Sequence, residues 1–324
     1  MNPRNNICPD ADFILRGHRF EITSLGFLSG TSHLVVGDVG GNLSLWSLES
    51  RRLVSRASLL HDHIISVKNF KNNQILTQGR DQKVKLMDLT SSTFEINSPL
   101  CTFQAGSYTF CEMDVDSENN WMILPAENPH SLQLWDLQQR EPLCILKSEK
   151  EKFGICMACR LLSLGAQHFA FAGYEDGSVV LWCLKTRKIL HRARYYDSPV
   201  MSLDVAANGI GFSGASGKKV VKFALNQNFD SFDSRGEVQL KTSGASSLCI
   251  RQDQKYFAVG GFDGKVRLFG FKKMKPLCVL SRHERAVTSI DIARANQNSS
   301  NRPWTMACGS RDKTISVWSV YADT

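Results

Sequence analysis

The hydrophobic and polar positions of this 324-residue chain repeat along its whole length. Short stretches alternate apolar with polar side chains, which is typical of half-buried β-strands, and each stretch ends in an aromatic or large apolar residue. These end residues are 41 to 49 residues apart and are Trp46, Met87, Trp135, Trp182, Phe223, Phe269 and Trp318. This period matches one blade of a β-propeller, so the pattern predicts seven blades.

Each unit follows the same plan before its end residue. A polar turn, a strand, a second turn and a strand of small residues lead into a tight turn, as in FAFAGYEDGS (169–178) and YFAVGGFDGK (256–265). Asp-Gly turns between alternating runs indicate hairpins, because glycine adopts the positive φ that such turns require. No segment has a sustained period of 3.6 residues, so we expect four antiparallel strands in each unit and few, short helices.

The two ends of the chain are predicted to close the ring. The segment Asp12–Gly17 reads as a strand and precedes the first full unit. We expect it to pair beside residues 317–320 in the last blade, because such pairing covers an otherwise open edge. The predicted fold is therefore all-β, a single seven-bladed propeller over residues 11–321, with short tails at 1–10 and 322–324.

Composition narrows the class of protein. Apolar residues make up 42% of the chain and charged residues 22%, as in ordinary globular proteins. The first ten residues lack the apolar run of a secretory signal, and no stretch approaches the roughly 18 apolar residues of a membrane span. We therefore expect a soluble, intracellular protein without membrane attachment. Its ten cysteines are scattered through strand patterns, where a reducing compartment leaves them as small hydrophobic residues.

The charge pattern indicates a solvated basic surface. The formal net charge is +8, but basic residues occur in short clusters without interleaved aromatic residues. A platform for single-stranded nucleic acid would combine both, so we expect no direct nucleic-acid binding. Acidic protein partners are the remaining interpretation of the charge.

The units resemble the WD repeat, in which His, Ser or Thr, Asp and Trp form a hydrogen-bonded tetrad within a blade. The last unit matches with His283, Ser310, Asp312 and Trp318. The resemblance implies a WD40 propeller in which these residues are structural, because a buried indole N–H and an imidazole need partners. A hydrolase triad is not predicted, since this spacing recurs with the blades.

The other units match less completely. Asp81, Asp176 and Asp263 occupy the tetrad aspartate position, six residues before the end residue. Units one, three and five have Gly40, Pro129 and Gly217 there instead, and the other convincing histidines are His18 and His61. Blade boundaries in units three and five are therefore less well defined by the sequence.

Segments that look like catalytic or metal sites have simpler interpretations. Cys156 and Cys159 form a CxxC, but no second pair completes four zinc ligands, so we expect core cysteines in a strand. The glycine-rich segment 211–218 lacks the Ser or Thr and the helix of a phosphate-binding loop, and is predicted to be a blade turn. Adjacent Glu175 and Asp176 point different ways and do not form an acid–base pair. We predict no enzyme activity, cofactor, metal or small-molecule substrate.

Surface residues must therefore carry the function. The residues just before the turn aspartates are expected at the rim of the central opening, and they are Arg80, Glu175, Phe262 and Arg311. Arginine and exposed phenylalanine are frequent anchors of protein interfaces, although these positions are also ordinary turn residues. Two polar segments, 228–242 and 295–303, are predicted loops that either add specificity or are tolerated insertions.

Longer segments resemble one WD-repeat family, the guanine nucleotide-binding protein beta subunit-like proteins related to the fungal ASTRA-associated protein. The matching segments are Gln78–Leu89, Ala172–Trp182, Gly211–Lys218, Pro276–Val287 and Ala307–Tyr321. The resemblance implies a monomeric propeller within a complex. Its partners would be components of the TTT co-chaperone and phosphatidylinositol 3-kinase-related kinases, whose stability it would support, and it would belong to the chromatin-linked ASTRA assembly.

Two related classes are alternatives. A heterotrimeric G-protein beta subunit begins with a long helix that pairs with gamma, whereas only about a dozen residues precede the first predicted strand here. A substrate receptor of a cullin ubiquitin ligase often has arginine three residues after the tryptophan of its WD motif. Here Trp135 and Asp136 are followed by Gln138 and then Arg140. The cullin receptor is kept as the alternative function.

Overall fold

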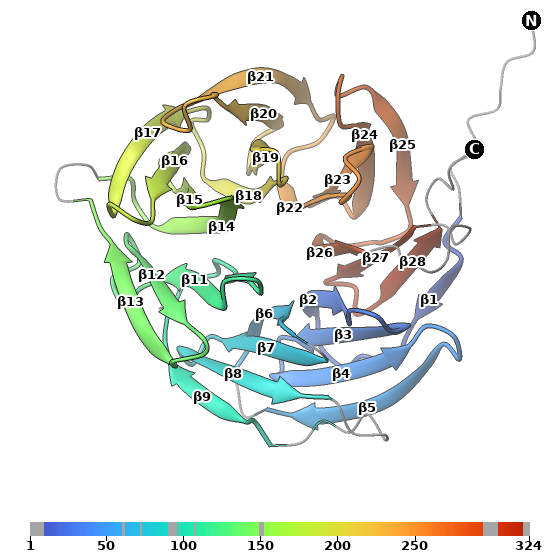
Figure 1. The fold of residues 1–324 in the computed structure, drawn as a ribbon. Coiled ribbons are helices and arrows are strands. Elements are labelled where there is room, and N and C mark those ends of the chain that lie inside the picture. Colours follow the sequence, from blue (N-terminus) through green and yellow to red (C-terminus); the bar gives the residue numbers. More distant parts are fainter. Residues whose placement is uncertain are drawn as a thin grey trace, which may run out of the picture.

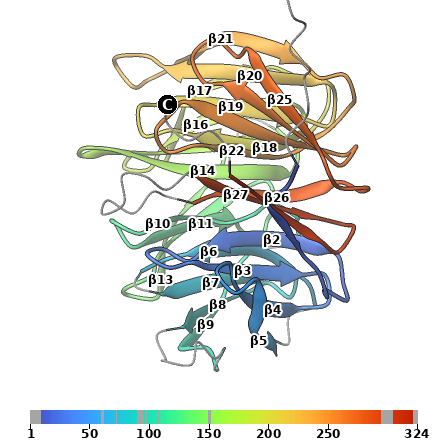
Figure 2. The ribbon, with the colours of Figure 1, turned by 90° about the vertical axis from the view of Figure 1, so that its right-hand side faces the viewer.

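The computed structural model describes residues 10–59, 62–71, 73–89, 96, 98–106, 108–148, 152–293 and 304–319. Its strands form seven four-stranded antiparallel sheets, arranged as blades in a ring (Figure 1). Figure 2 shows the same ring from its edge. The described residues contain no helix, and so none that could cross a membrane. The predicted all-β, seven-bladed propeller is confirmed.

Within each of the first six blades, the strands follow one another in chain order from the channel outward. Blade one contains β2 (Ile22–Phe27), β3 (His33–Asp38), β4 (Asn42–Ser47) and β5 (Arg52–Ser58). Blade two contains β6 (Ile64–Asn69), β7 (Gln74–Gly79), β8 (Lys83–Asp88) and β9 (Cys101–Gln104). Blade three contains β10 (Asp114–Asp116), β11 (Trp121–Pro125), β12 (Leu132–Asp136) and β13 (Glu141–Leu146). Blade four contains β14 (Cys156–Leu164), β15 (Gln167–Tyr174), β16 (Ser178–Cys183) and β17 (Lys188–Arg194). Blade five contains β18 (Val200–Val205), β19 (Ile210–Ala215), β20 (Lys219–Leu225) and β21 (Phe232–Gln239). Blade six contains β22 (Ala245–Ile250), β23 (Tyr256–Gly261), β24 (Lys265–Gly270) and β25 (Pro276–Ser281).

The seventh blade joins both ends of the chain. Its strands are β26 (Val287–Ile292), β27 (Thr305–Ser310), β28 (Ile315–Ser319) and, as the outer strand, β1 (Phe13–Leu15). Strand β1 pairs antiparallel with β28, with Phe13 opposite Val317 and Leu15 opposite Ile315. The predicted closure is confirmed, and position 320 lies outside the described residues.

The hydrophobic core is divided among the seams between blades. Each seam contains one cluster of buried apolar side chains. At the seam between blades seven and one, Trp46 packs in the same cluster as Ile22 and Val317. Burying one large apolar side chain contributes about 1.5–3 kcal/mol, so the seams together hold the ring closed.

In five of the seven blades, a glycine near the end of the second strand allows the neighbouring blade to approach closely. A β-carbon added to Gly37 would lie 2.4 Å from a side-chain carbon of Ile64, the first residue of the next blade. The same conflict, with the first residue of the next inner strand, recurs at Gly173, Gly214, Gly260 and Gly309. The small-residue strands seen in the sequence are therefore close-approach positions.

Blade two closes its seam differently, with Gln78 at the position of these glycines. The Gln78 side chain is buried and reaches across to blade three. Its Nε2 donates to the carbonyl of Cys111 at 3.1 Å, and its Oε1 accepts from the amide of Met113 at 2.7 Å. One side chain thus satisfies two backbone groups of the neighbouring blade.

Two predicted loops need correction. Most of the segment 228–242 is strand β21, the outer strand of blade five, because Phe232 is buried against Phe171 and Phe223. Its other residues are mostly exposed, so an outer strand facing solvent reads as a polar loop. The glycine-rich segment 211–218 is largely strand β19, and only its last three residues form a turn. The segment 295–303 lies outside the described residues.

Candidate protein-binding surface

The last blade contains the predicted tetrad, but one of its four members is a different residue from the one predicted. Asp312 Oδ2 lies 2.9 Å from His283 Nδ1, and His283 Nε2 lies 2.8 Å from Ser316 Oγ. The same hydroxyl accepts from Trp318 Nε1 at 2.8 Å. Ser316 is two residues before the tryptophan, so both side chains lie on one face of the strand. The chain of bonds runs from the turn to the core of the blade.

Ser310 was predicted as the hydroxyl of this tetrad, and that assignment is wrong. Its Oγ donates to the carbonyl of Arg285 at 3.0 Å and accepts from the amide of Asp312 at 3.1 Å. Ser310 therefore holds the turn that carries Asp312. The serine that joins histidine to tryptophan is Ser316, which the resemblance alone did not identify.

Asp312, His283 and Ser316 are arranged like a hydrolase triad, yet the arrangement is structural. Ser316 has no exposed surface, and His283 is also buried. Burial opposes ionisation of Asp312, but hydrogen bonds from His283 and Thr314 lower its pKa well below the usual range. A nucleophile must be reachable by substrate, and this hydroxyl is not.

Other blades replace the tetrad with different polar groups. In blade six, Asp263 accepts from Arg267 at 2.6 Å and from Thr242 at 2.6 Å. Burial alone would raise the pKa of Asp263, but these bonds lower it to about 2. In blade four, Asp176 accepts from Ser178 and from Arg192. These carboxylates therefore hold turns and strands together within their blades.

The CxxC is part of the core, as predicted. Cys156 and Cys159 are fully buried on β14, beside Cys111 from the neighbouring blade. The Cys111 sulfur lies 4.0 Å from that of Cys156 and 3.8 Å from that of Cys159. Burial raises the pKa of the Cys156 thiol, so it stays protonated. Among the described residues, no group of three side chains is placed to hold a metal ion.

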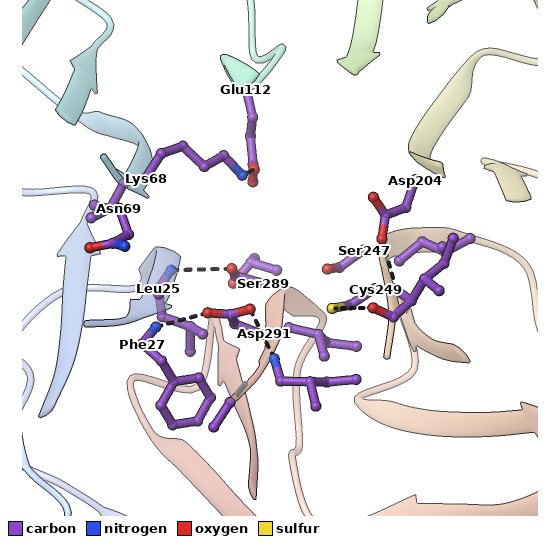
Figure 3. Close-up of a pocket in the computed structure, with 18 of the residues that line it drawn as sticks. Leu25, Phe27, Lys68, Asn69, Glu112, Asp204, Ser247, Cys249, Ser289 and Asp291 are labelled. Atoms are coloured by element: carbon purple, nitrogen blue, oxygen red, sulfur yellow. Dashed lines mark hydrogen bonds and ion pairs between the residues drawn. The ribbon is translucent and has the colours of Figure 1, made fainter. Parts of the chain in front are cut away.

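The inner strands surround a channel of about 1710 Å³. Two ion pairs lie on the channel wall. Lys68 pairs with Glu112 at 2.9 Å, and Arg160 pairs with Asp204 at 3.2 Å. Figure 3 shows Lys68 and Glu112 across the opening from Asp204, with Asp291 below them in this view.

Carboxylates of the channel wall also accept hydrogen bonds from backbone amides. Asp204 accepts from the amide of Ile250 at 2.8 Å, and Asp291 accepts from that of Phe27 at 2.8 Å (Figure 3). Burial raises the pKa of Asp204 even though Arg160 opposes the shift. These hydrogen bonds therefore join the inner strands of neighbouring blades.

The end of the channel where the inner strands begin carries exposed aromatic side chains. We define this rim surface by Phe20, Glu21, Arg80, Phe110, Phe262 and Arg311. Phe20 is 45% exposed, Phe110 60% and Phe262 44%. Exposed aromatic side chains that are held in place are typical anchors of protein interfaces.

Each of these rings packs against a neighbouring group. A β-carbon on Gly40 would lie 2.4 Å from the Phe20 ring, and one on Gly244 would lie 2.0 Å from the Phe262 ring. Both phenylalanines therefore rest directly on glycine backbone. Phe110 is covered by the Arg80 guanidinium, 5.0 Å from the ring centre, in a cation–π contact.

The structure separates the four predicted rim residues. Phe262 and Arg311 line the channel, whereas Arg80 stands behind Phe110. Glu175 is exposed on the same end of the ring, does not line the channel, and accepts from the amide of Ile155 at 3.3 Å.

Sequence reasoning missed Phe20 and Phe110 at this rim. The available signal for Phe20 was glycine at position 40, where four other blades have aspartate. Of the two additional histidines, His18 is buried and contacts Trp46, and His61 lies outside the described residues.

Comparison with known proteins agrees with this fold. The family described as "WD domain, G-beta repeat" matches residues 11–47, 237–269 and 274–319. The chain is 30% identical to "Guanine nucleotide-binding protein subunit beta-like protein 1" of Mus musculus, over 97% of each chain. It is 26% identical to "ASTRA-associated protein 1" of Verticillium alfalfae, over 89% of this chain and 80% of the relative. The protein of that name from Schizosaccharomyces japonicus is 23% identical, over 97% of this chain and 100% of the relative.

Proposed function

Because this chain belongs to the family of the guanine nucleotide-binding protein subunit beta-like protein 1, we propose that it is a non-enzymatic scaffold of an ASTRA-type assembly. Relatives named ASTRA-associated protein 1 match most of the chain and support this proposal. In finer terms, the protein acts as a co-adaptor of the TTT co-chaperone complex. In that role it supports the stability of phosphatidylinositol 3-kinase-related kinases in the cytoplasm and nucleus.

One observation carries the proposal, namely the rim surface, in which three exposed phenylalanine rings pack against neighbouring groups. An aromatic side chain already held in place loses little conformational freedom when a partner covers it, so more of its burial energy contributes to binding. Arg80 and Arg311 stand beside these rings and add charged contacts. Enzyme chemistry lacks comparable support, since the triad-like serine is buried and the channel carboxylates bind backbone.

The first experiment identifies the partners. Tagged protein is purified from cells and the co-purified proteins are identified by mass spectrometry, while kinase abundance is measured after depletion of the protein. Recovery of TTT components together with loss of the large kinases supports the proposal. Recovery of cullin adaptors with unchanged kinase abundance would replace it with the ubiquitin-ligase receptor.

The second experiment asks whether the rim surface holds these partners. We expect Arg80→Ala/Arg311→Ala to fold normally and to recover less of the TTT components. The matched control is Leu143→Ala/Ile145→Ala, which removes exposed apolar side chains from outer strand β13. Unchanged recovery with the arginine variant, or equal loss with the control, would contradict a role for the rim.

A further inference from the structure

A groove that shares Phe20, Glu21 and Arg311 with the rim surface lies at the seam where blades seven and one meet. It has a volume of about 450 Å³ and opens on the same end of the ring as the rim surface. Its lining comes from both ends of the chain: Arg19, Phe20, Glu21 and Val39 from blade one, and Glu284, Arg285, Arg311, Asp312 and Lys313 from blade seven.

The apolar part of the groove is preformed. Phe20 presents 45% of its surface to solvent while its ring rests on Gly40. Val39 lines the groove beside it. An apolar side chain placed here would cover a ring that is already held, so little ordering is needed on the propeller side.

The charged part of the groove contains four cationic side chains. They are Arg19, Arg285, Arg311 and Lys313. Among the described residues, neither Arg19 nor Lys313 forms an ion pair. Asp312 belongs to the tetrad, where it also accepts from the amides of Glu284 and Thr314. Its charge is therefore already used within the blade.

Glu21 pairs with two of these cations, Arg285 and Arg311. Its carboxylate lies 3.4 Å from Arg285 Nη1 and 3.9 Å from Arg311 Nε. Both distances are long, and the arginine side chains are 67% and 61% exposed. Exposed ion pairs of this kind contribute at most about 1 kcal/mol, so another carboxylate can take the place of Glu21 at small cost.

We propose that this groove binds an acidic segment of a partner protein, in which an apolar side chain stands next to carboxylates. The apolar side chain packs on Phe20, and a carboxylate displaces Glu21 from Arg285 and Arg311. This inference rests on the proposed function as a protein scaffold and specifies the chemistry of one of its contacts.

The acids in the groove favour a peptide over a nucleic acid. Glu21, Glu284 and Asp312 stand among the four cations. They would repel a phosphodiester chain, which carries a negative charge on every unit. A peptide can place its carboxylates only beside the arginines, because its charges sit on separate side chains.

The test measures peptide binding to the full chain by fluorescence anisotropy. The probe is a fluorescein-labelled peptide in which pairs of glutamates alternate with single leucines. We expect Arg19→Ala/Arg285→Ala to weaken binding about tenfold, and Phe20→Ala to weaken it by a similar factor. Glu21→Gln should strengthen binding several-fold, because it removes the internal competitor. The matched control, Arg52→Ala/Arg235→Ala, removes two exposed arginines from outer strands β5 and β21.

Several outcomes would overturn the inference. They are weaker or unchanged binding by Glu21→Gln, equal binding of a peptide with lysine in place of glutamate, and tighter binding of a single-stranded oligonucleotide. The assay needs no cellular partner. Absence of peptide binding with intact recovery of TTT components would therefore reject the groove alone. Peptide binding without TTT recovery would reject the proposed function alone.

Discussion

The ring of Phe20 rests on the backbone of Gly40, where a β-carbon would lie 2.4 Å from the ring. Position 40 is the tetrad aspartate position of blade one, so the loss of the aspartate makes room for an exposed aromatic side chain. We predict that Gly40→Ala displaces Phe20 and lowers recovery of partner proteins. The melting temperature should change little, because Phe20 is 45% exposed and its burial contributes little to folding.

Blade five offers a matched control for that change. Gly217 occupies the same turn position, and a β-carbon there would meet only Ser198 Oγ, at 3.4 Å. Gly217→Ala should therefore leave both partner recovery and stability unchanged. If both alanine variants reduced recovery equally, the seat of Phe20 on Gly40 would have no specific role.

The assignment of the tetrad serine can be tested by unfolding in urea. Ser316→Ala leaves the buried groups of His283 and Trp318 without their shared partner, which costs about 2–3 kcal/mol. Ser310→Ala removes one bond within the turn and one to the carbonyl of Arg285, and should cost about 1 kcal/mol. A larger loss of stability for Ser310→Ala would restore that serine to the tetrad.

The clamp at the seam between blades two and three gives a further prediction. Gln78→Met keeps the length of the side chain but leaves the Cys111 carbonyl and the Met113 amide unpaired. We expect the free energy of unfolding to fall by about 2–3 kcal/mol. Gln104→Met, on the exposed face of outer strand β9, is the control and should change stability by less than about 0.5 kcal/mol. Equal stability of the two variants would mean that Gln78 does not clamp the seam.

His18 predicts a loss of stability in mild acid. Burial, assisted by the charge of Arg56, lowers its pKa from 6.5 to about 4. The unfolded chain therefore binds a proton at a higher pH than the folded protein does. The stability due to neutral His18 is complete above pH 6.5 and declines as the pH falls toward about 4, by about 3 kcal/mol.

The histidine contribution is isolated by comparison with His18→Gln. Urea unfolding of both proteins is measured at several pH values across this window. The stability of the wild type should fall relative to that of the variant as the pH is lowered. Parallel curves for the two proteins would show that His18 does not titrate as its burial implies.

The sequence predicted the architecture because propeller strands repeat a local pattern. Seven end residues and the turn glycines located the blades, and the strand-like segment at Asp12–Gly17 predicted the closure. Strand β21 was misread because an outer strand exposes polar side chains, so it lacks alternation.

The candidate site was less predictable, because contacts between distant segments define it. Nothing local in the sequence places Arg80 on Phe110 or Glu21 between Arg285 and Arg311. Ser316 was overlooked for a related reason. Both Ser310 and Ser316 stand near Asp312 in the sequence, and only the fold shows which hydroxyl reaches His283.

The most direct test of the account measures the abundance of the phosphatidylinositol 3-kinase-related kinases in cells depleted of this protein. The cells receive the wild type, the rim variant Phe110→Ala/Phe262→Ala, or the outer-strand control Leu143→Ala/Ile145→Ala, at equal expression. We predict that the wild type and the control restore the kinases and that the rim variant does not. Full restoration by the rim variant, or no restoration by the wild type, would contradict the account.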